Sequence, residues 1–472
     1  MSAPHDLSAL EQAAAIRAGE LSPVELVEHY LTRIEQHGDS VGAFITVAAD
    51  RAREQARSAA QAVVDGARLP PLHGVPTAIK DLNMTAGLRT TFGSAVMVDN
   101  VPEMDDFVVT RLREAGTINL GKTNTPEFGF PCYTEPTIAP PARTPWDLSR
   151  LAAGSSGGAG AAVAAGLVPF AQGSDGGGSI RSPASVCGLV GIKTSRGRVS
   201  GGPLGFDFAG LGVLGPLART VRDAAAMLDA MAGPMPGDPT WAPPLPVGES
   251  FLDHAGRDPG RLRIGRYVDP VVPGAVVDPA VRRAWEDTST LLASLGHDVE
   301  DIAAPLTADL IPHFEVVWSM SATTLPVPPE RIGELLPLTR WLRDKGLAAT
   351  AQQSAVALGT LSQHSRDVIA STADYDVLLA PVCTLPPRPV GWFLEDGEGA
   401  PDFERQKQFS AYTALYNMTG QPAISIPVQW SDDGLPLGMM LVGRPTDEAT
   451  LIALSAQLEA AQPWIGRRPT MW

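Results

Sequence analysis

Amphipathic stretches with a helical period alternate along this chain with short runs of apolar residues. The clearest helix begins after Ser22: Pro23 takes the first helical position, and Ser22 and Glu25 match a capping box. Gly38 predicts its end. Further helices are predicted over residues 48–64, 106–114, 159–165, 220–231, 278–296 and 447–460. Buried strands are predicted over residues 75–79, 117–120, 167–171, 423–429 and 437–442. This alternation indicates an α/β fold.

Three segments lack a regular period. Residues 123–153 predict a long loop, and loops of this length in compact domains usually serve a function. Residues 233–248 contain six prolines and predict a surface linker. Residues 306–345 mix apolar and proline-rich pieces, and we interpret them as a variable cover over the functional site.

Composition and charge exclude several classes of partner. The chain has 472 residues, of which 44% are hydrophobic, enough for a large buried core. Its net charge of −16 argues against nucleic acid, since phosphate contacts need clustered Lys and Arg. Neither a signal peptide nor an apolar segment of about 18 residues is recognisable, which predicts a cytoplasmic protein with no membrane partner. The widely spaced Cys132, Cys187 and Cys383 indicate free thiols, not disulfides or a zinc site.

Two serine–glycine clusters and one lysine carry the candidate chemistry. Ser155 lies in the run Ala-Gly-Ser-Ser-Gly-Gly at 153–158, and Ser179 in Gly-Gly-Gly-Ser-Ile-Arg at 176–181. Glycines let main-chain N–H groups turn toward a ligand. Lys80 ends an apolar strand, where desolvation would lower its pKa and make it a base near neutral pH. A nucleophile, a base and a cradle of N–H groups are the components of acyl transfer.

Three other interpretations fit parts of this pattern. Residues 116–123 match the Walker A expression, but Ile118 and Leu120 suit a strand better than a phosphate-binding loop. Residues 154–158 match a nucleophile elbow centred on Ser156, but the residues before them are poor strand material and no histidine shares their context. The glycines could also form turns between packed elements. Composition and spacing alone leave catalysis and this structural role equally open.

On a larger scale the chain resembles the amidase signature family. Residues 154–184 are similar to the family signature: Gly-Ser-Ser-Gly-Gly, an alanine-rich helix, Gly-Ser-Asp, then Gly-Gly-Ser-Ile-Arg and Pro-Ala. Further similar motifs lie at residues 72–76, 121–124, 187–193, 375–381 and 419–423, so the likeness covers nearly the whole chain. The resemblance implies one domain over 1–472 with a central twisted mixed β-sheet covered by helices on both faces. Its signature core would span about 70–230, and the variable cover about 233–345.

By position, the resemblance implies a Ser-cisSer-Lys triad. Ser179 matches the nucleophile, Ser155 the bridging serine on a cis peptide bond, and Lys80 the general base. The expected oxyanion-hole donors are the N–H groups of Gly176, Gly177, Gly178 and Ser179. The residues matched to supporting positions are Ser156, Asp175 and Arg181. Two positions depart from the family pattern: Ala153 stands where glycine is common, and Gly176 where many relatives have a larger residue.

The function that this resemblance implies is a serine amidohydrolase. It would cleave the C–N bonds of small linear or aryl amides through an acyl-enzyme on Ser179, with carbamates and esters as further candidates. The sequence is similar to the branch that contains nylon-oligomer (6-aminohexanoate) hydrolases. No metal or organic cofactor is implied, and the oligomeric state stays open, a homodimer included. Two alternatives also stay open: the amidase subunit of a tRNA-dependent amidotransferase, and a catalytically inactive binding protein on the same scaffold.

The loop before the signature supplies candidate pocket walls. Phe130, Cys132 and Tyr133 would suit an apolar acyl or aryl group, and ordinary core packing explains them equally well. The candidates for the cover are Phe314, Trp318 and Trp341.

Overall fold

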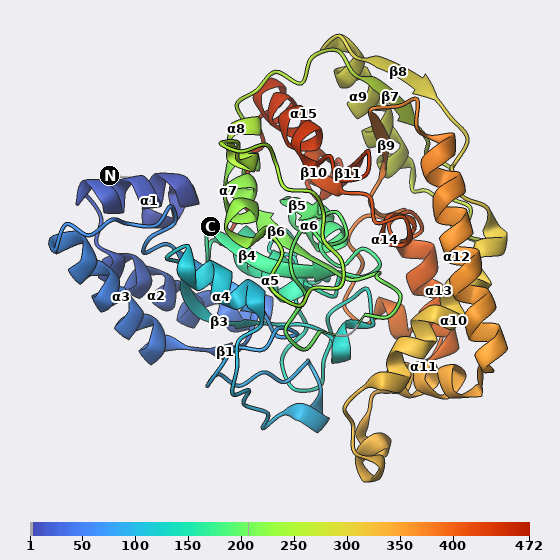
Figure 1. Cartoon of the computed structure of the whole chain (residues 1–472), viewed down its shortest axis with the longest axis horizontal. Coiled ribbons are helices and arrows are strands. Elements are labelled where there is room, and N and C mark those ends of the chain that lie inside the picture. The colour runs from blue at the N-terminus through green and yellow to red at the C-terminus, as the bar shows by residue number, and fades with distance from the viewer. Residues whose placement is uncertain (1–2, 206) are drawn as a thin grey trace.

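A mixed β-sheet runs through the centre of the molecule (Figure 1), in a computed structural model that describes residues 3–205 and 207–472. Within these residues the sheet has eight strands in the order β4-β6-β5-β10-β11-β9-β7-β8. The strands are β4 Phe170–Asp175, β5 Val190–Lys193, β6 Val213–Ala218, β7 Arg263–Arg266, β8 Asp298–Asp301, β9 Val377–Pro381, β10 Ala423–Trp430 and β11 Pro436–Gly443. β7 runs parallel to β8 and β9, and the other neighbours pair antiparallel. The mixed sheet implied by the resemblance is confirmed.

The two faces of this sheet belong to two separate hydrophobic cores. On β9, Leu378 and Ala380 join one core, and Val377 and Leu379 join the other, as the two-residue period of a strand requires. Helices α5 and α6 pack into the first core, and α7, α9 and α15 into the second. The expectation of helices on both faces is therefore confirmed.

The helices are interspersed with the strands along the chain and carry the labels of Figure 1. In chain order they are α1 Ala9–Ala18, α2 Pro23–Val41, α3 Ala49–Val64, α4 Phe107–Glu114, α5 Gly157–Ala164, α6 Arg181–Cys187, α7 Val221–Met231, α8 Phe251–His254, α9 Pro279–Ser294, α10 Ile311–Ser321, α11 Pro337–Ala348, α12 Ala351–Ser371, α13 Ala400–Phe409, α14 Leu415–Met418 and α15 Glu448–Ala461. None of the described helices is long and apolar enough to cross a membrane.

A second, smaller sheet brings the lysine strand to the edge of the first. It consists of β1 (Phe44–Val47), β3 (Ile118–Thr123) and β2 (Pro76–Lys80) in that order, with β2 parallel to β3. The backbone N–H of Lys80 donates to Gln172 Oε1 on β4, at 3.0 Å. The end of β2 is therefore fixed against the edge strand of the main sheet.

The Walker A match at residues 116–123 falls mostly on β3. Lys122 is fully buried there, and its Nζ donates to Thr90 Oγ1 at 2.8 Å and lies 3.6 Å from Asp81 Oδ1. A phosphate-binding loop needs a free lysine and open backbone N–H groups. The buried Lys122 instead bonds to residues inside the protein next to the small sheet.

Two predicted boundaries are wrong. The helix after Ser22 continues beyond Gly38 to Val41 and ends at Gly42, which has a φ of 57°. Its N-cap is a bond from the Val24 N–H to Ser22 Oγ, not a capping box with Glu25.

The strand predicted over 167–171 lies instead at Phe170–Asp175. The prediction followed the apolar residues and therefore began and ended too early in the chain. It missed the polar residues of β4, which have hydrogen-bond partners inside the protein. Gln172 Nε2, for example, donates to Asn83 Oδ1 at 2.9 Å.

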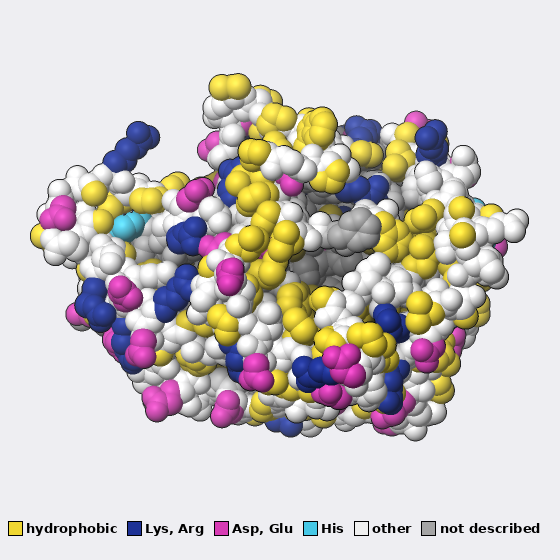
Figure 2. Space-filling model, turned by 60° about the horizontal axis from the view of Figure 1, so that its bottom comes forward, with side chains coloured by type: hydrophobic (Ala, Val, Ile, Leu, Met, Phe, Trp, Pro, Cys, Tyr) yellow, Lys and Arg dark blue, Asp and Glu magenta, His cyan; other side chains and the backbone are white. Residues whose placement is uncertain are grey.

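The segment interpreted as a cover is mostly helical. Helices α10 and α11 lie beside α12 and α13 at one end of the molecule (Figure 1). On the face shown in Figure 2, apolar side chains gather around a hollow, while charged side chains of both signs are scattered toward the rim.

Candidate active site

Lys80 lies at the point where the two sheets meet. It is fully buried, and its Nζ lies 2.8 Å from Ser155 Oγ and 2.9 Å from Ser174 Oγ. Burial lowers the pKa of Lys80 well below its usual value, and the negative charge of Asp175 opposes this only in part. The environment therefore favours the neutral amine, which is able to accept a proton.

Ser155 follows a cis peptide bond after Gly154. Gly154 passes so close to Tyr133 that an added Cβ would lie 2.7 Å from the backbone nitrogen of Tyr133, so no other residue fits here. Ala153 has a φ of 55°, in the left-handed region that glycine adopts most easily. This backbone conformation gives a physical reason for the glycine that is common at this position in the signature.

Ser156 ties the two serine clusters together. Its backbone N–H donates to the carbonyl oxygen of Ser179 at 3.1 Å. Its hydroxyl donates to the Ser174 carbonyl at 3.2 Å and accepts from the Ser174 N–H at 3.3 Å. Ser156 is therefore engaged in holding the backbone and is not placed as an elbow nucleophile.

A buried ion pair shapes the turn that carries Ser179. Asp175 ends β4 and Arg181 begins α6, and both side chains are fully buried. The Arg181 Nη2 and Nε groups donate to the two Asp175 oxygens at 2.8 and 3.0 Å. Burial alone would raise the pKa of Asp175, but the charge and hydrogen bonds of Arg181 hold it below the usual range. The pair closes the turn between strand and helix.

The carboxylate of Asp175 also uses one of the expected oxyanion-hole donors. The Gly178 N–H donates to Asp175 Oδ1 at 2.8 Å. Gly178 therefore departs from the expectation, because its N–H already has an acceptor. Among the described residues, the N–H groups of Gly176, Gly177 and Ser179 have no acceptor.

Ser179 is 8% exposed and lines a cavity of about 80 Å³. Its hydroxyl makes no hydrogen bond with the residues that the structure describes. An unengaged serine, three unused N–H groups and a buried amine bonded to a second serine are together suited to acyl transfer.

Comparisons with known proteins point to the same chemistry. A family model described as Amidase matches residues 25–452. The chain belongs to the amidase signature family. It is 41% identical over 483 residues to the putative amidase AmiB2 of Mycobacterium tuberculosis, and the match covers 99% of each chain.

Solved structures of two other amidases have the same fold. A 6-aminohexanoate cyclic dimer hydrolase matches with a TM-score of 0.92 and 32% identity over 100% of both chains. A bacterial aryl acylamidase matches with a TM-score of 0.88 and 28% identity, over 99% of this chain and 100% of the other. The present chain is thus an amidase that acts on amide C–N bonds, as its sequence predicts.

The walls of this amidase's cavity differ in part from the expectation. Phe130 and Cys132 line the cavity. Tyr133 lies behind it, because its ring stacks on Phe393 at 4.7 Å and its hydroxyl donates to Asp402 Oδ2 at 2.7 Å.

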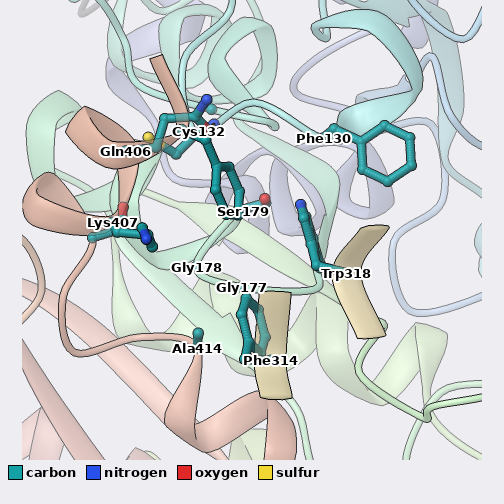
Figure 3. Close-up of a pocket in the computed structure, with 13 residues that line it drawn as sticks. Phe130, Cys132, Gly177, Gly178, Ser179, Phe314, Trp318, Gln406, Lys407 and Ala414 are labelled. Carbon is teal, nitrogen blue, oxygen red and sulfur yellow. Dashed lines mark hydrogen bonds between the residues drawn. The ribbon is translucent and has the colours of Figure 1, made fainter. Parts of the chain in front are cut away.

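The cover contributes fewer residues than expected. Phe314 and Trp318, both on α10, line the cavity beside Ser179 and Gly177 (Figure 3). Trp341 does not, because it packs on Phe403 at a ring distance of 5.6 Å.

Several residues of the site carry no signal in the sequence. Ser174 contacts Lys80, and Phe403, Gln406 and Lys407 reach the cavity from α13. Ser174 immediately precedes Asp175, so its place beside Lys80 could have been suspected from the signature. The α13 residues lie more than 200 positions further along the chain, and only the tertiary fold brings them to Ser179. Among the described residues, no group of three or more His, Cys, Asp or Glu side chains is placed to hold a metal ion.

Proposed function

We propose that this amidase hydrolyses small linear or aryl amides through an acyl-enzyme on Ser179, with carbamates and esters as further substrates. The observation that supports this most directly is the fully buried Lys80 amine, 2.8 Å from Ser155 Oγ. Ser155 and Ser179 belong to two clusters that the Ser156 N–H joins. The names of the relatives, an aryl acylamidase and a 6-aminohexanoate cyclic dimer hydrolase, agree with this substrate range.

In the acylation half, neutral Lys80 accepts the Ser155 proton while Ser155 Oγ accepts the proton of Ser179. Ser179 Oγ then bonds to the amide carbonyl carbon, and the carbonyl oxygen becomes an oxyanion. The N–H groups of Gly176, Gly177 and Ser179 donate to this oxygen, and one well-aimed donor contributes about 3 kcal/mol. The C–N bond breaks as the proton returns through Ser155 to the leaving amine.

In the deacylation half, a water molecule takes the place of the amine. Lys80 and Ser155 remove its proton as its oxygen bonds to the acyl carbon. The bond from Ser179 Oγ to the acyl carbon breaks, and the proton returns to Ser179. The products are a carboxylic acid and the enzyme in its starting state. This scheme needs no metal or organic cofactor.

Product release by the purified chain tests the proposal: amine from the amides and the carbamate, and alcohol from the ester. The substrates are an anilide, a linear aliphatic amide, a carbamate and an ester, each assayed without ATP. Ser179→Ala and Lys80→Ala should each lose at least about 10³-fold in kcat, as is typical of catalytic units. Ser58→Ala, an exposed serine on α3, is the matched control and should keep full activity.

Three results would contradict the proposal. If either variant keeps more than about a hundredth of the wild-type kcat, the role proposed for that residue is wrong. Activity only with added partner subunits and ATP would favour the amidotransferase alternative, and no activity with any substrate would favour a binding protein.

A further inference from the structure

Trp318 touches the turn of the proposed oxyanion hole at a place where the chain has no side chain. A Cβ added to Gly176 would lie 3.4 Å from both Cη2 and Cζ3 of the Trp318 indole, which is van der Waals contact. A Cβ on Gly177 would lie 3.9 Å from Cη2. The φ of Gly176 lies outside the left-handed region, so the backbone itself would accept a side chain here. The indole therefore lies directly against the place where a side chain at position 176 would begin.

The helix that carries Trp318 is held in place by charges from two neighbouring helices. Glu315 on α10 accepts from Lys345 Nζ of α11 at 2.6 Å, and it also bonds to Lys407 Nζ of α13. Trp318 further packs against a small apolar cluster that includes Leu342. These contacts hold the indole on the side away from the turn, and the absence of a side chain at Gly176 lets the indole pack against the turn itself.

The cavity beside this indole has several aromatic walls, and among the described residues that line it no charge is unpaired. Phe314 stacks on Trp318 at 5.6 Å with an interplanar angle of 19°, and Phe130 meets it edge-on at 5.8 Å and 88°. Figure 3 shows the rings of Phe314 and Trp318 next to Gly177. Lys407, the lining cation, is already paired with both Glu315 and Glu404. An uncharged ring matches these walls better than a charged or branched group.

We propose that Gly176 and Trp318 act as a pair that selects amides with an uncharged aryl group next to the scissile bond. This inference rests on the proposed function, since it takes Ser179 as the nucleophile. The ring would stand on either the acyl or the amine side, as in a benzamide or an anilide. Trp318 is the specificity-determining residue, and Gly176 sets its position.

The two positions make a matched set of variants. Gly176→Ala adds only the Cβ, which fits in contact with the indole. Because the Gly176 N–H also belongs to the proposed oxyanion hole, Gly176→Ala is the reference variant, and any loss it shows equally on all substrates is assigned to the oxyanion hole. Gly176→Ile adds carbons that must displace the indole. It should lower kcat/KM for ring-bearing amides about tenfold or more, the range by which apolar pockets discriminate. Linear hexanamide should be affected far less.

The decisive measurement is a double-mutant cycle with Gly176→Ile and Trp318→Ala, assayed on acetanilide, benzamide and hexanamide. Comparison of acetanilide with benzamide shows which side of the bond carries the ring. Trp318→Ala should abolish the preference for ring-bearing amides. In its background, Gly176→Ile should cost the ring-bearing amides no more than it costs hexanamide, because no indole remains to be displaced. Circular dichroism confirms that each variant is folded.

Covalent labelling of Ser179 by a fluorophosphonate separates the possible failures. If the wild-type serine is labelled but the two substitutions act independently, or slow all three substrates equally, the Gly176–Trp318 inference is wrong and the proposed function stands. If the wild-type serine is not labelled and no amide is cleaved, the proposed function fails and this inference fails with it.

Discussion

Replacement of Arg181 by methionine should destabilise this amidase and disturb the turn that carries Ser179. Arg181 is fully buried, and its guanidinium donates to four oxygen acceptors. Two of these are the oxygens of Asp175, and the others are the Thr413 carbonyl and Asn417 Oδ1, at 2.9 and 2.7 Å. Methionine is unbranched and apolar, is shorter than arginine and has no donor, so it would leave the carboxylate of Asp175 without its cation.

The size of the effect follows from the burial of the pair. Removal of one partner of a buried ion pair costs about 3–5 kcal/mol, because the remaining charge stays in a medium of low polarity. Unfolding entropy is about 2 cal/mol/K per residue, so each kcal/mol shifts Tm by about 1 °C in a chain of 472 residues. Arg181→Met should therefore lower Tm by about 3–5 °C. Arg181→Lys keeps the charge and should lose less than half as much.

Thermal unfolding followed by circular dichroism measures this shift, and amide hydrolysis measures the effect on the turn. Asp175 accepts from the Gly178 N–H and, at 3.1 Å, from the Ile180 N–H on either side of Ser179, so kcat should fall together with Tm. A wild-type Tm and kcat for Arg181→Met would refute the reasoning, because the pair would then support neither the fold nor the turn.

Three further predictions concern Lys80, its neighbour and the wall behind the cavity. Because burial lowers the pKa of Lys80, kcat/KM for a neutral amide should fall as the pH drops through that pKa. It should reach its plateau at a pH well below the usual lysine pKa. Lys80→Arg, whose side chain stays protonated, should lose about 10³-fold in kcat/KM. Ser174→Ala removes one hydroxyl partner of Lys80 Nζ and should lower kcat about tenfold, with recovery in Ser174→Thr. Tyr133→Phe removes the hydroxyl that donates to Asp402, a carboxyl group whose pKa burial raises to about 6. The free energy of unfolding should fall by about 1–3 kcal/mol, while kcat for a small amide changes little.

The pH dependence of stability gives one more test, with its sign set by Asp175. Because the folded pKa of Asp175 is lowered, its pairing contributes stability that is fully present above the usual Asp pKa. This contribution is lost as the pH falls through the folded value. Asp175→Asn should therefore be less stable than wild type at pH 7 and show a smaller further loss in acid. An equal acid loss in both proteins would contradict the assignment.

Much of the fold could be predicted from local periodicity. The helices over 220–231 and 447–460 agree with α7 and α15 to within one residue at each end, since the N-cap residues Thr220 and Asp447 mark their starts. The end of β4 could not be predicted, because Gln172 is buried in the strand by partners that lie far away in the sequence. The smaller sheet, which separates β2 from the main sheet, likewise follows from tertiary contacts and not from any local pattern.

The site was predictable where its residues belong to a local motif. Ser155, Ser156, Asp175, Ser179 and Arg181 all lie in the signature, and the fold brings these residues together. The cavity walls were only partly predictable. The sequence around Tyr133 does not show that its ring packs on Phe393 and does not line the cavity.

The contribution of α13 to the cavity was equally hidden, since Gln406 and Lys407 look like surface residues of an amphipathic helix. Gly178 shows a further limit of motif reasoning. Its N–H bonds to a side chain three residues earlier, a detail that only the folded turn fixes.

The central claim is that Lys80, through Ser155, makes Ser179 a nucleophile. The most direct test is the rate at which a fluorophosphonate labels the protein, with the modified peptide mapped by mass spectrometry. The label should lie on Ser179 in wild type, be absent in Ser179→Ala, and form at least about 10²-fold more slowly in Lys80→Ala and Ser155→Ala. Labelling at another residue, or an unchanged rate in Lys80→Ala, would contradict the account.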